Sequence, residues 1–388
     1  MTTGAPLAGY RVLELAHLVA GPVCGLYLAD MGADVVKIED TEAGDYSRAM
    51  GRMRGGVSDS FRLLNRNKRA MRLDLKQPRG RDAFLRLAQR ADVVVEGFRP
   101  GVTAKLGVAY DAVSAVNARI VYCSITGYGQ GGPYAGRAGH DINYVGYAGV
   151  GDQIGTAEAP VVPNFQIADL LGGALVPAMG ILAALLDART SGRGRYVDVS
   201  MTDAALAHAV FPLLGYLEQG KMPARGTGML DGGLPCYNLY RTKDGRFMAV
   251  GALERKFWAA LCDSLGCPEL KDRHIVYGTD AAPVKARLAE IFASRTQKEW
   301  TGFLAAADCC VTPVLAIDEA LGNEQLRARG MIVEEGDFIQ LALPLKFSEF
   351  AFAIERGAPA AGQHTDEILR EAGYGEKDIA AMRKEGVI

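Results

Sequence analysis

Short apolar runs alternate with helical stretches along the first half of the chain. Val-rich and Ile-rich runs predict buried strands, and the segments between them carry helical spacing or a helix-start signal such as Pro at the first helical position. The predicted strands are residues 11–16, 34–39, 71–75, 92–96, 119–125 and 196–200. The predicted helices are residues 21–31, 78–89, 110–117 and 169–188. This β–α alternation predicts a mainly parallel sheet covered by helices on both faces.

The pattern changes after a helix predicted over residues 202–219. Residues 221–236 are rich in Gly, Pro and Met and predict a linker or an active-site loop. Strands predicted at 237–241 and 246–250 flank Asp244-Gly245, a hairpin signal. Helices are predicted at 254–265, 281–294, 297–307, 365–372 and 376–385. We therefore predict a large domain over 1–200, a linker helix over 201–224, a small α+β domain over 225–330 and a C-terminal segment over 331–388.

Composition narrows the class of protein. The chain has 388 residues, of which 49% are hydrophobic, and a net charge of −2. These values are typical of a globular protein and give no electrostatic reason to expect nucleic acid or an anionic membrane as partner. The seven cysteines form no paired framework, and we expect no secretory leader, so a reducing, cytoplasmic location is predicted. Neither the cysteines nor the histidines have metal-ligand spacing, so no metal is expected.

One stretch resembles a membrane span by composition. Residues 170–186 carry no charge and are bounded by Asp169 and Asp187. The stretch is short for a span and contains Gly and Pro, so a buried core helix is predicted and no membrane partner is expected.

Three residues are candidates for chemistry. His140 lies in a glycine-containing loop, where a neutral imidazole can exchange a proton near physiological pH, although an isolated loop histidine more often only bonds the backbone. Asp169 precedes the apolar run and is either a helix N-cap or a carboxyl group beside a substrate carbonyl. Glu254 follows a predicted strand and either orients a catalytic group or caps a helix.

Two nucleotide interpretations come from the first half of the chain. The first β–α–β unit ends its second strand at Glu39, yet the glycine fingerprint of dinucleotide-binding proteins is missing, which disfavours a nucleotide-dependent oxidoreductase. A basic group, Arg66, Lys68, Arg69 and Arg72, fits one phosphorylated small molecule or a solvated surface.

Several motifs spread over the whole chain resemble the family III CoA-transferases, also called the CaiB/BaiF family. The segment Arg137-Ala138-Gly139-His140-Asp141-Ile142-Asn143-Tyr144, together with Ala168-Asp169 and Leu230-Asp231-Gly232-Gly233, is most similar to the α-methylacyl-CoA racemases within it. The wider matches are Gly21-Pro22, residues 32–39, Gly44-Asp45 with Arg48, Asn67-Lys68-Arg69, Phe98-Arg99-Pro100-Gly101, Gly127-Tyr128-Gly129, residues 229–233, residues 240–245 and Gly362-Gln363-His364-Thr365.

The resemblance implies a fold and a partner. It implies a Rossmann-like large domain that binds a CoA thioester, a smaller α+β domain, and a C-terminal segment that returns to the large domain. It also implies an obligate, interlocked homodimer, with each site between the large domain of one chain and the small domain of its partner. The residues expected to contact CoA phosphates and adenine are Lys37, Arg48, Lys68, Arg69, Phe98 and Arg99.

The resemblance implies two mechanisms. In a racemase of 2-methylacyl-CoA thioesters, His140 and Asp169 exchange the α-proton through an enolate, with Glu254 near the site. In a CoA-transferase, Asp169 is a covalent nucleophile; His140 favours the racemase, because acyl transfer needs no such proton carrier. CoA enters as part of the substrate, and no prosthetic group is expected. A non-catalytic acyl-CoA-binding protein would be favoured by loss of His140 or Asp169, and both are present. Departures from the racemase pattern, at Leu234, Cys236 and Arg255-Lys256, leave the acyl group open.

Overall fold

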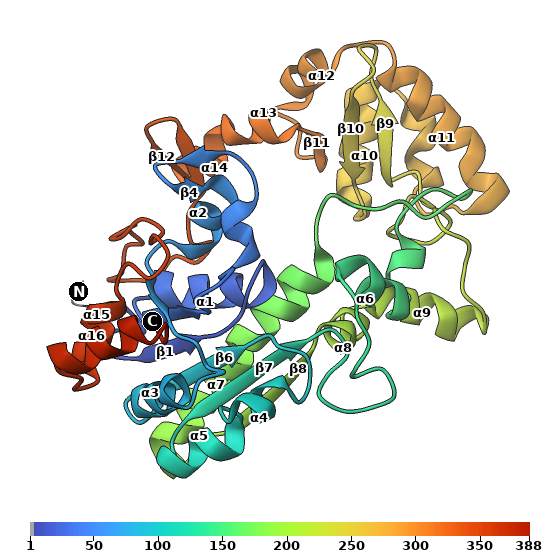
Figure 1. The fold of residues 1–388 in the computed structure, drawn as a ribbon. Coiled ribbons are helices and arrows are strands. Elements are labelled where there is room, and N and C mark those ends of the chain that lie inside the picture. The colour runs from blue at the N-terminus through green and yellow to red at the C-terminus, as the bar shows by residue number, and fades with distance from the viewer. Residues whose placement is uncertain (1–3) are drawn as a thin grey trace. The chain divides into compact units, whose positions relative to one another are not determined.

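The computed structural model describes residues 4–388 and separates them into two compact units (Figure 1). The large unit contains the stretch ending at Gly149, Asn164–His208 and Met331–Ile388. The small unit contains Val150–Pro163 and Ala209–Gly330. The large unit is therefore built from three separate parts of the chain, and its last part is the C-terminal segment.

A six-stranded parallel sheet forms the centre of the large unit, as the β–α alternation predicted. Its strands, in spatial order, are β5 (Arg69–Arg72), β2 (Asp34–Glu39), β1 (Arg11–Glu14), β6 (Val93–Glu96), β7 (Val121–Thr126) and β8 (Tyr196–Ser200). The order reverses between β1 and β6. In sheets of this kind, ligands bind beyond the carboxyl ends of the strands at such a reversal.

Helices cover this sheet and supply its core. One apolar cluster joins Leu13 and Val94 of the sheet to Phe84, Leu369 and Met382 of the helices. The helices of the large unit are α1 (Ala20–Asp30), α2 (Asp59–Asn65), α3 (Pro78–Ala88), α4 (Val102–Leu106), α5 (Tyr110–Val116), α6 (Asp141–Tyr147), α7 (Val176–Ser191), α8 (Met201–Ala207), α15 (Thr365–Glu371) and α16 (Glu376–Lys384). Two short hairpins, β3 (Met53–Arg54) with β4 (Val57–Ser58) and β12 (Ile332–Glu335) with β13 (Phe338–Leu341), complete it, with a 3-10 turn η1 at Tyr46–Ala49.

The small unit has an antiparallel sheet and its own core. The order is β11 (Val311–Pro313), β10 (Phe247–Gly251) and β9 (Tyr237–Arg241). The predicted hairpin between β9 and β10 is confirmed, and Gly245 in its turn has a φ of +79°. Trp258, Phe292 and Trp300 are buried at the centre. The helices are α9 (Val210–Gln219), α10 (Arg255–Leu265), α11 (Gly278–Phe292), α12 (Gln297–Leu304), α13 (Ile317–Leu321) and α14 (Glu324–Ala328), with 3-10 turns η2 (Gly151–Gln153) and η4 (Pro268–Arg273).

Two predicted elements differ from the structure. The strand expected at 71–75 is β5, which begins earlier, because Arg69 is buried by ion pairs that its sequence neighbourhood does not reveal. The helix expected over 202–219 is two helices, α8 and α9, and the break at His208 coincides with the boundary between the units. The short helices α2, α4, α6, α13 and α14 were not predicted.

The apolar stretch that follows Asp169 forms one continuous helical segment, Ala168–Ser191. Within residues 4–388 it is the single helix long and apolar enough to cross a membrane, and 44% of its most apolar window is buried. The segment contacts α1, α8, β7 and β8, so one of its faces packs in the core of the large unit, whereas a fully buried helix was predicted. Its exposed side chains Leu175, Met179 and Leu186 line an apolar cavity of about 600 Å³.

Candidate active site

Asp169 lies at the start of a π-helical segment, η3 (Ala168–Leu175), that continues into α7. Ile167 occupies the N-cap position, so the alternative role of Asp169 as an N-cap is wrong, and the carboxyl group belongs to the first turn. π-Helical turns are rare and recur at functional sites because they shift side chains out of the α-helical register.

Two glycines set the position of this segment. A Cβ on Gly173 would lie 2.4 Å from the Cβ of Ala20 on α1, and a Cβ on Gly172 would lie 2.9 Å from the Cα of Met201 on α8. Only glycine allows such close approach on both sides. The start of the helix is therefore fixed between α1 and α8, and Asp169 is fixed with it.

His140 lies at the N-cap of α6, and α6 contacts the π-helical segment (Figure 1). The imidazole is exposed to solvent. The backbone N–H of His140 donates to Oδ1 of Asn143 at 3.0 Å, and Oδ1 of Asp141 accepts the backbone N–H of Asp169 at 3.0 Å. The fold thus brings together two residues that the sequence marked as proton carriers.

The surroundings of Asp169 favour its protonated form. Burial, and then the negative charge of Asp141, raise the pKa of Asp169 to about 6, while His140 acts in the opposite direction. Burial and Asp169 also raise the pKa of Tyr144 to about 12. A carboxyl group with a pKa near 6 is present in both protonation states close to neutral pH, so it can both accept and donate a proton.

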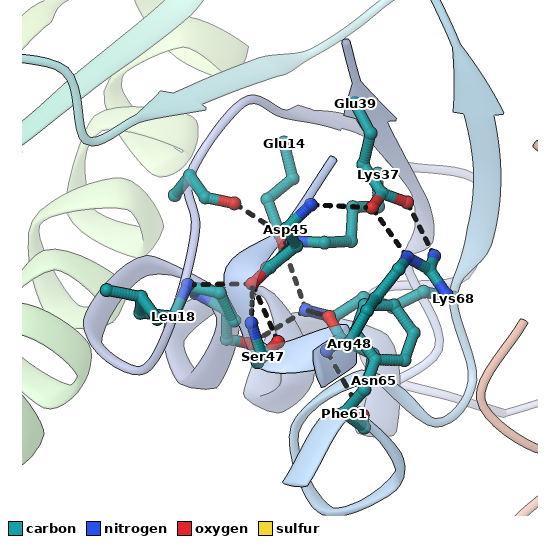
Figure 2. Close-up of polar contacts among 12 residues, drawn as sticks. Glu14, Leu18, Lys37, Glu39, Asp45, Ser47, Arg48, Phe61, Asn65 and Lys68 are labelled. Carbon is teal, nitrogen blue, oxygen red and sulfur yellow. Dashed lines mark hydrogen bonds and ion pairs between the residues drawn. The ribbon is translucent and has the colours of Figure 1, made fainter. Parts of the chain in front are cut away.

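Two of the lysines expected to bind phosphate are buried in an ion-pair cluster (Figure 2). The ammonium of Lys37 bonds Glu14 at 3.0 Å, the carbonyl oxygen of Ala16 at 2.9 Å and Asp45 at 2.7 Å. The ammonium of Lys68 bonds Glu14 at 2.7 Å and two further oxygens. Each ammonium has three donors and all are used. Both side chains are fully buried, so the structure gives them a structural role in place of the phosphate contact that the resemblance implied.

Arg48 and Arg69 are also held by acidic groups of the same chain. Arg48 makes a bidentate pair with Glu39 at 2.6 and 2.5 Å and stacks on the ring of Phe61 (Figure 2). Arg69 is 5% exposed and bonds Asp34, Glu367 and Glu371, which joins α15 to the sheet. Neither guanidinium is left for a phosphate in this arrangement.

Phe98 and Arg99 follow β6, at the reversal of strand order. The backbone N–H of Phe98 donates to the buried carboxyl of Glu96 at 2.8 Å, and its half-buried ring lies 6.0 Å from the ring of His17. Arg99 is exposed, and within residues 4–388 no hydrogen bond or ion pair holds its guanidinium, which acts electrostatically on Tyr144. Arg99 is therefore the member of the predicted set whose charge is available to an anionic ligand.

Glu254 belongs to the small unit, where it is exposed at the N-cap of α10 and makes no side-chain capping bond. Its role beside His140 stays a prediction. Leu234 and Cys236, which depart from the racemase pattern, are fully buried in the core of the small unit. Their identity there is a matter of packing.

Sequence reasoning missed Asp141 and Tyr144, although both lie in the segment that it singled out. The side chain of Asp141 accepts the backbone N–H of Asp169, and the hydroxyl of Tyr144 bonds the carbonyl oxygen of Gly139 next to His140, which only the fold shows.

Among the described residues, no group of three His, Cys, Asp or Glu side chains could hold a metal ion.

The large unit thus combines a parallel sheet that has a strand-order reversal with two neighbouring helical segments that carry His140 and Asp169. The model of CoA-transferase family III matches residues 7–365, and the chain belongs to this family. The α-methylacyl-CoA racemase of Homo sapiens is 36% identical, over 98% of this chain and 97% of its own length. The succinate–glutarate CoA-transferase of Agrobacterium fabrum is 34% identical, over 94% and 95%. A CaiB/BaiF family protein from Brucella suis has a crystal structure that superposes with a TM-score of 0.83 at 30% identity, covering 95% of this chain and 99% of that one.

Proposed function

We propose that the protein is a racemase of 2-methylacyl-CoA thioesters. The observation that carries the proposal is the pairing of His140 with an Asp169 carboxyl whose pKa is raised to about 6 at the start of a neighbouring helix. Racemisation needs two groups that can each hold the proton in turn, and an acid and a base matched near neutral pH fulfil that need.

In the proposed reaction the two side chains stand on opposite sides of the α-carbon. From the S enantiomer, neutral His140 removes the α-proton, the electrons pass into the thioester carbonyl as an enolate, and protonated Asp169 delivers its proton to the other face. From the R enantiomer the roles are reversed. The pair therefore holds one proton before and after each turnover, and two while the substrate is an enolate.

A second set of residues is proposed to bind the CoA part of the substrate. Arg99 is proposed to bind a CoA phosphate, because its exposed guanidinium is not held by the chain, and Phe98 is proposed to stack on the adenine. Lys37, Arg48, Lys68 and Arg69 are proposed to hold the walls of the site in place. Glu254 of a partner chain completes the site in this proposal.

Homodimerisation by interlocking is part of the proposal. The helix α9 supports it, because its sequence is apolar and none of its residues is buried. Phe211, Leu214 and Leu217 are exposed there, and exposed apolar groups of this size are typical of an interface. Sedimentation should give a dimer; a stable monomer at micromolar concentration would contradict this part. A cytoplasmic location without membrane attachment stays a prediction.

A second candidate function is CoA transfer between carboxylic acids. The similarity to the succinate–glutarate CoA-transferase favours it, since that enzyme is nearly as similar as the racemase. In this case Asp169 attacks the thioester and forms an acyl anhydride, and His140 has no required step.

Deuterium exchange at C2 of a 2-methylacyl-CoA in heavy water separates the two functions. If the protein is a racemase, the 2-methylacyl-CoA should incorporate deuterium at C2 and lose optical purity without any acceptor acid. Absence of exchange, together with CoA transfer to a free carboxylate and trapping of Asp169 by hydroxylamine, would sink the racemase proposal. Replacing His140 by Ala should abolish racemisation and leave dimerisation intact.

A further inference from the structure

The helix α6 contacts the backbone at both proton carriers. It begins directly after His140 and packs against the π-helical segment that carries Asp169. Asp141 in its first turn and Tyr144 one turn later each bond to the backbone of a different catalytic segment. Neither bond is needed to form α6 itself.

Asp141 secures the segment of Asp169. A helix start leaves backbone N–H groups without partners, and the N-cap residue here, Ile167, has no side-chain oxygen to accept one. Oδ1 of Asp141 accepts the N–H of Asp169 at 3.0 Å and so acts as a cap supplied by another helix. This bond ties the backbone of Asp169 to α6.

Tyr144 secures the loop of His140. Its hydroxyl donates to the carbonyl oxygen of Gly139, the residue before His140, at 2.5 Å. Its buried ring fills the space in which a Cβ on Gly127 or Gly139 would lie, 2.2 and 2.6 Å from ring atoms. With Asn143 holding the N–H of His140, the peptide group between Gly139 and His140 is bonded to α6 through both its carbonyl oxygen and its N–H.

We propose that Asp141 and Tyr144 are positioning residues which, through α6, set the separation of the two proton carriers. Asp141 acts on Asp169 and Tyr144 acts on His140. The inference rests on the proposed racemase function, and it predicts which half of the reaction each residue supports. Two ionisable groups act on the Asp169 carboxyl, Asp141 in α6 and His140 at its N-cap. The residues of α1 and α8 that pack against the same helical segment are apolar: Ala20, Met201 and Ala204.

The two enantiomers report on the two residues separately. Inversion of configuration must slow equally from the S and the R enantiomer, because both directions use His140 and Asp169 together. Deuterium exchange with retention of configuration needs only the one base that removes the proton and returns a deuteron to the same face. That base is Asp169 for the R enantiomer, so its exchange should survive when His140 is displaced. It is His140 for the S enantiomer, so its exchange should survive when Asp169 is displaced.

The variant Tyr144→Phe keeps the ring and removes the hydroxyl. We expect exchange from the S enantiomer in heavy water to fall about tenfold to a hundredfold, since small misplacements of a catalytic group have effects of that size. Exchange with retention from the R enantiomer should persist. Tyr134→Phe is the matched control, because its ring belongs to the same aromatic group and it should retain wild-type exchange.

The variants Asp141→Ala and Asp141→Asn separate position from charge. Asp141→Ala should lower exchange from the R enantiomer by a similar factor. Asp141→Asn keeps an acceptor oxygen, so its rate of exchange from the R enantiomer should stay close to that of the wild type. Because the charge of Asp141 contributes to the raised pKa of Asp169, the low-pH limb of that exchange should move to lower pH by about one unit in Asp141→Asn. Asp203→Asn, in the first turn of α8, is the control.

A measurement that does not depend on turnover completes the test. Amide hydrogen exchange at Asp169 should become faster in Asp141→Ala than in wild type or in Asp141→Asn. Two results would overturn the positioning role while leaving the racemase proposal intact. One is an unchanged hydrogen-exchange rate of the Asp169 amide in Asp141→Ala. The other is an equal loss of substrate deuterium exchange from both enantiomers in Tyr144→Phe. A wild-type protein that exchanges neither enantiomer would remove the racemase proposal and this inference together.

Discussion

At the scale of single residues, burial decides whether a charged side chain binds a ligand or holds the fold. Lys37 and Arg99 are both basic and both belong to motifs of the family, yet Lys37 is fully buried with three oxygens around its ammonium. Arg99 is exposed at the reversal of strand order. The sequence does not distinguish them, because the partners of Lys37 lie on other elements.

Replacing these two residues should have opposite effects on stability and binding. Lys37→Met removes the ion-pair partner of the buried Asp45 and one of the two partners of Glu14, which keeps Lys68, and should lower the free energy of unfolding by about 3–5 kcal/mol. Arg99→Ala should change it by less than about 0.5 kcal/mol while raising KM for the CoA thioester about tenfold. Denaturant titration and steady-state kinetics measure both. A stable Lys37→Met enzyme with a raised KM would reverse the assignment.

The raised pKa of Asp169 makes the stability of the protein depend on pH. The folded-state pKa of about 6 lies above the ordinary value of 3.8, so the ionised carboxyl is disfavoured in the folded protein, and this cost grows as pH rises from about 4 through 6. Asp169→Asn should therefore raise the free energy of unfolding at pH 8 by about 1–3 kcal/mol, and should change it little at pH 4. Thermal melting of both proteins across this range tests the sign; a less stable variant at pH 8 contradicts it.

At the scale of elements, the sequence predicted most helices and strands but not the irregular ones. The strands β1, β2, β6 and β8 lie close to their predicted ranges because most of their buried residues are apolar neighbours in sequence, although the buried Glu14, Lys37, Glu39 and Glu96 also belong to them. The π-helical start of the long helix was not predicted, because it depends on the contacts of Gly172 and Gly173 with α1 and α8. The same holds for the site: the pair His140 and Asp169 was found, whereas the bonds of Asp141 and Tyr144 depend on packing.

A methyl group at the π-helical segment should disturb both stability and catalysis. Gly173→Ala places a Cβ 2.4 Å from that of Ala20, so α1 and the segment must separate. We expect a loss of about 1–3 kcal/mol in the free energy of unfolding and a clear loss of kcat. In Gly302→Ala, within α12, the new Cβ meets no atom within 4 Å, and the variant should gain up to about 1 kcal/mol. Equal behaviour of the two variants would mean that the glycine contacts do not fix the segment.

At the scale of the whole molecule, the chain leaves the large unit, forms most of the small unit and then returns. The α15 and α16 helices place Leu369 and Met382 in the core of the sheet, and Val387, which follows α16, joins them there. The carbonyl oxygen of Val387 accepts the N–H of Asp74 at 2.8 Å. The parallel sheet was predictable from local patterning, whereas the membership of this last segment in the core came only from family resemblance, since contacts so distant in sequence leave no periodic signal.

Removing the last helix should therefore prevent stable folding. A chain ending after Gly375 lacks the buried side chains of Ile379, Met382 and Val387, each of which contributes about 1.5–3 kcal/mol when buried. The sum approaches the whole stability of a typical domain, so we expect insoluble protein or no cooperative melting transition. Glu376→Ala removes only an exposed ion pair with Arg370 and should melt like the wild type. A soluble, cooperatively melting truncated chain would refute the expectation.

The threefold division of the large unit also orders events during synthesis. Strands β1 and β2 leave the ribosome before the small unit, yet the helices α15 and α16 that complete their core are translated after it. The residues of the small unit, from Val150–Pro163 and Ala209–Gly330, are all available before then. The apolar face of the early strands must consequently stay exposed, or be covered by chaperones, until α15 and α16 have left the ribosome. Slowing elongation between the codons of the small unit and those of α15 would lengthen that interval and favour aggregation of the nascent chain.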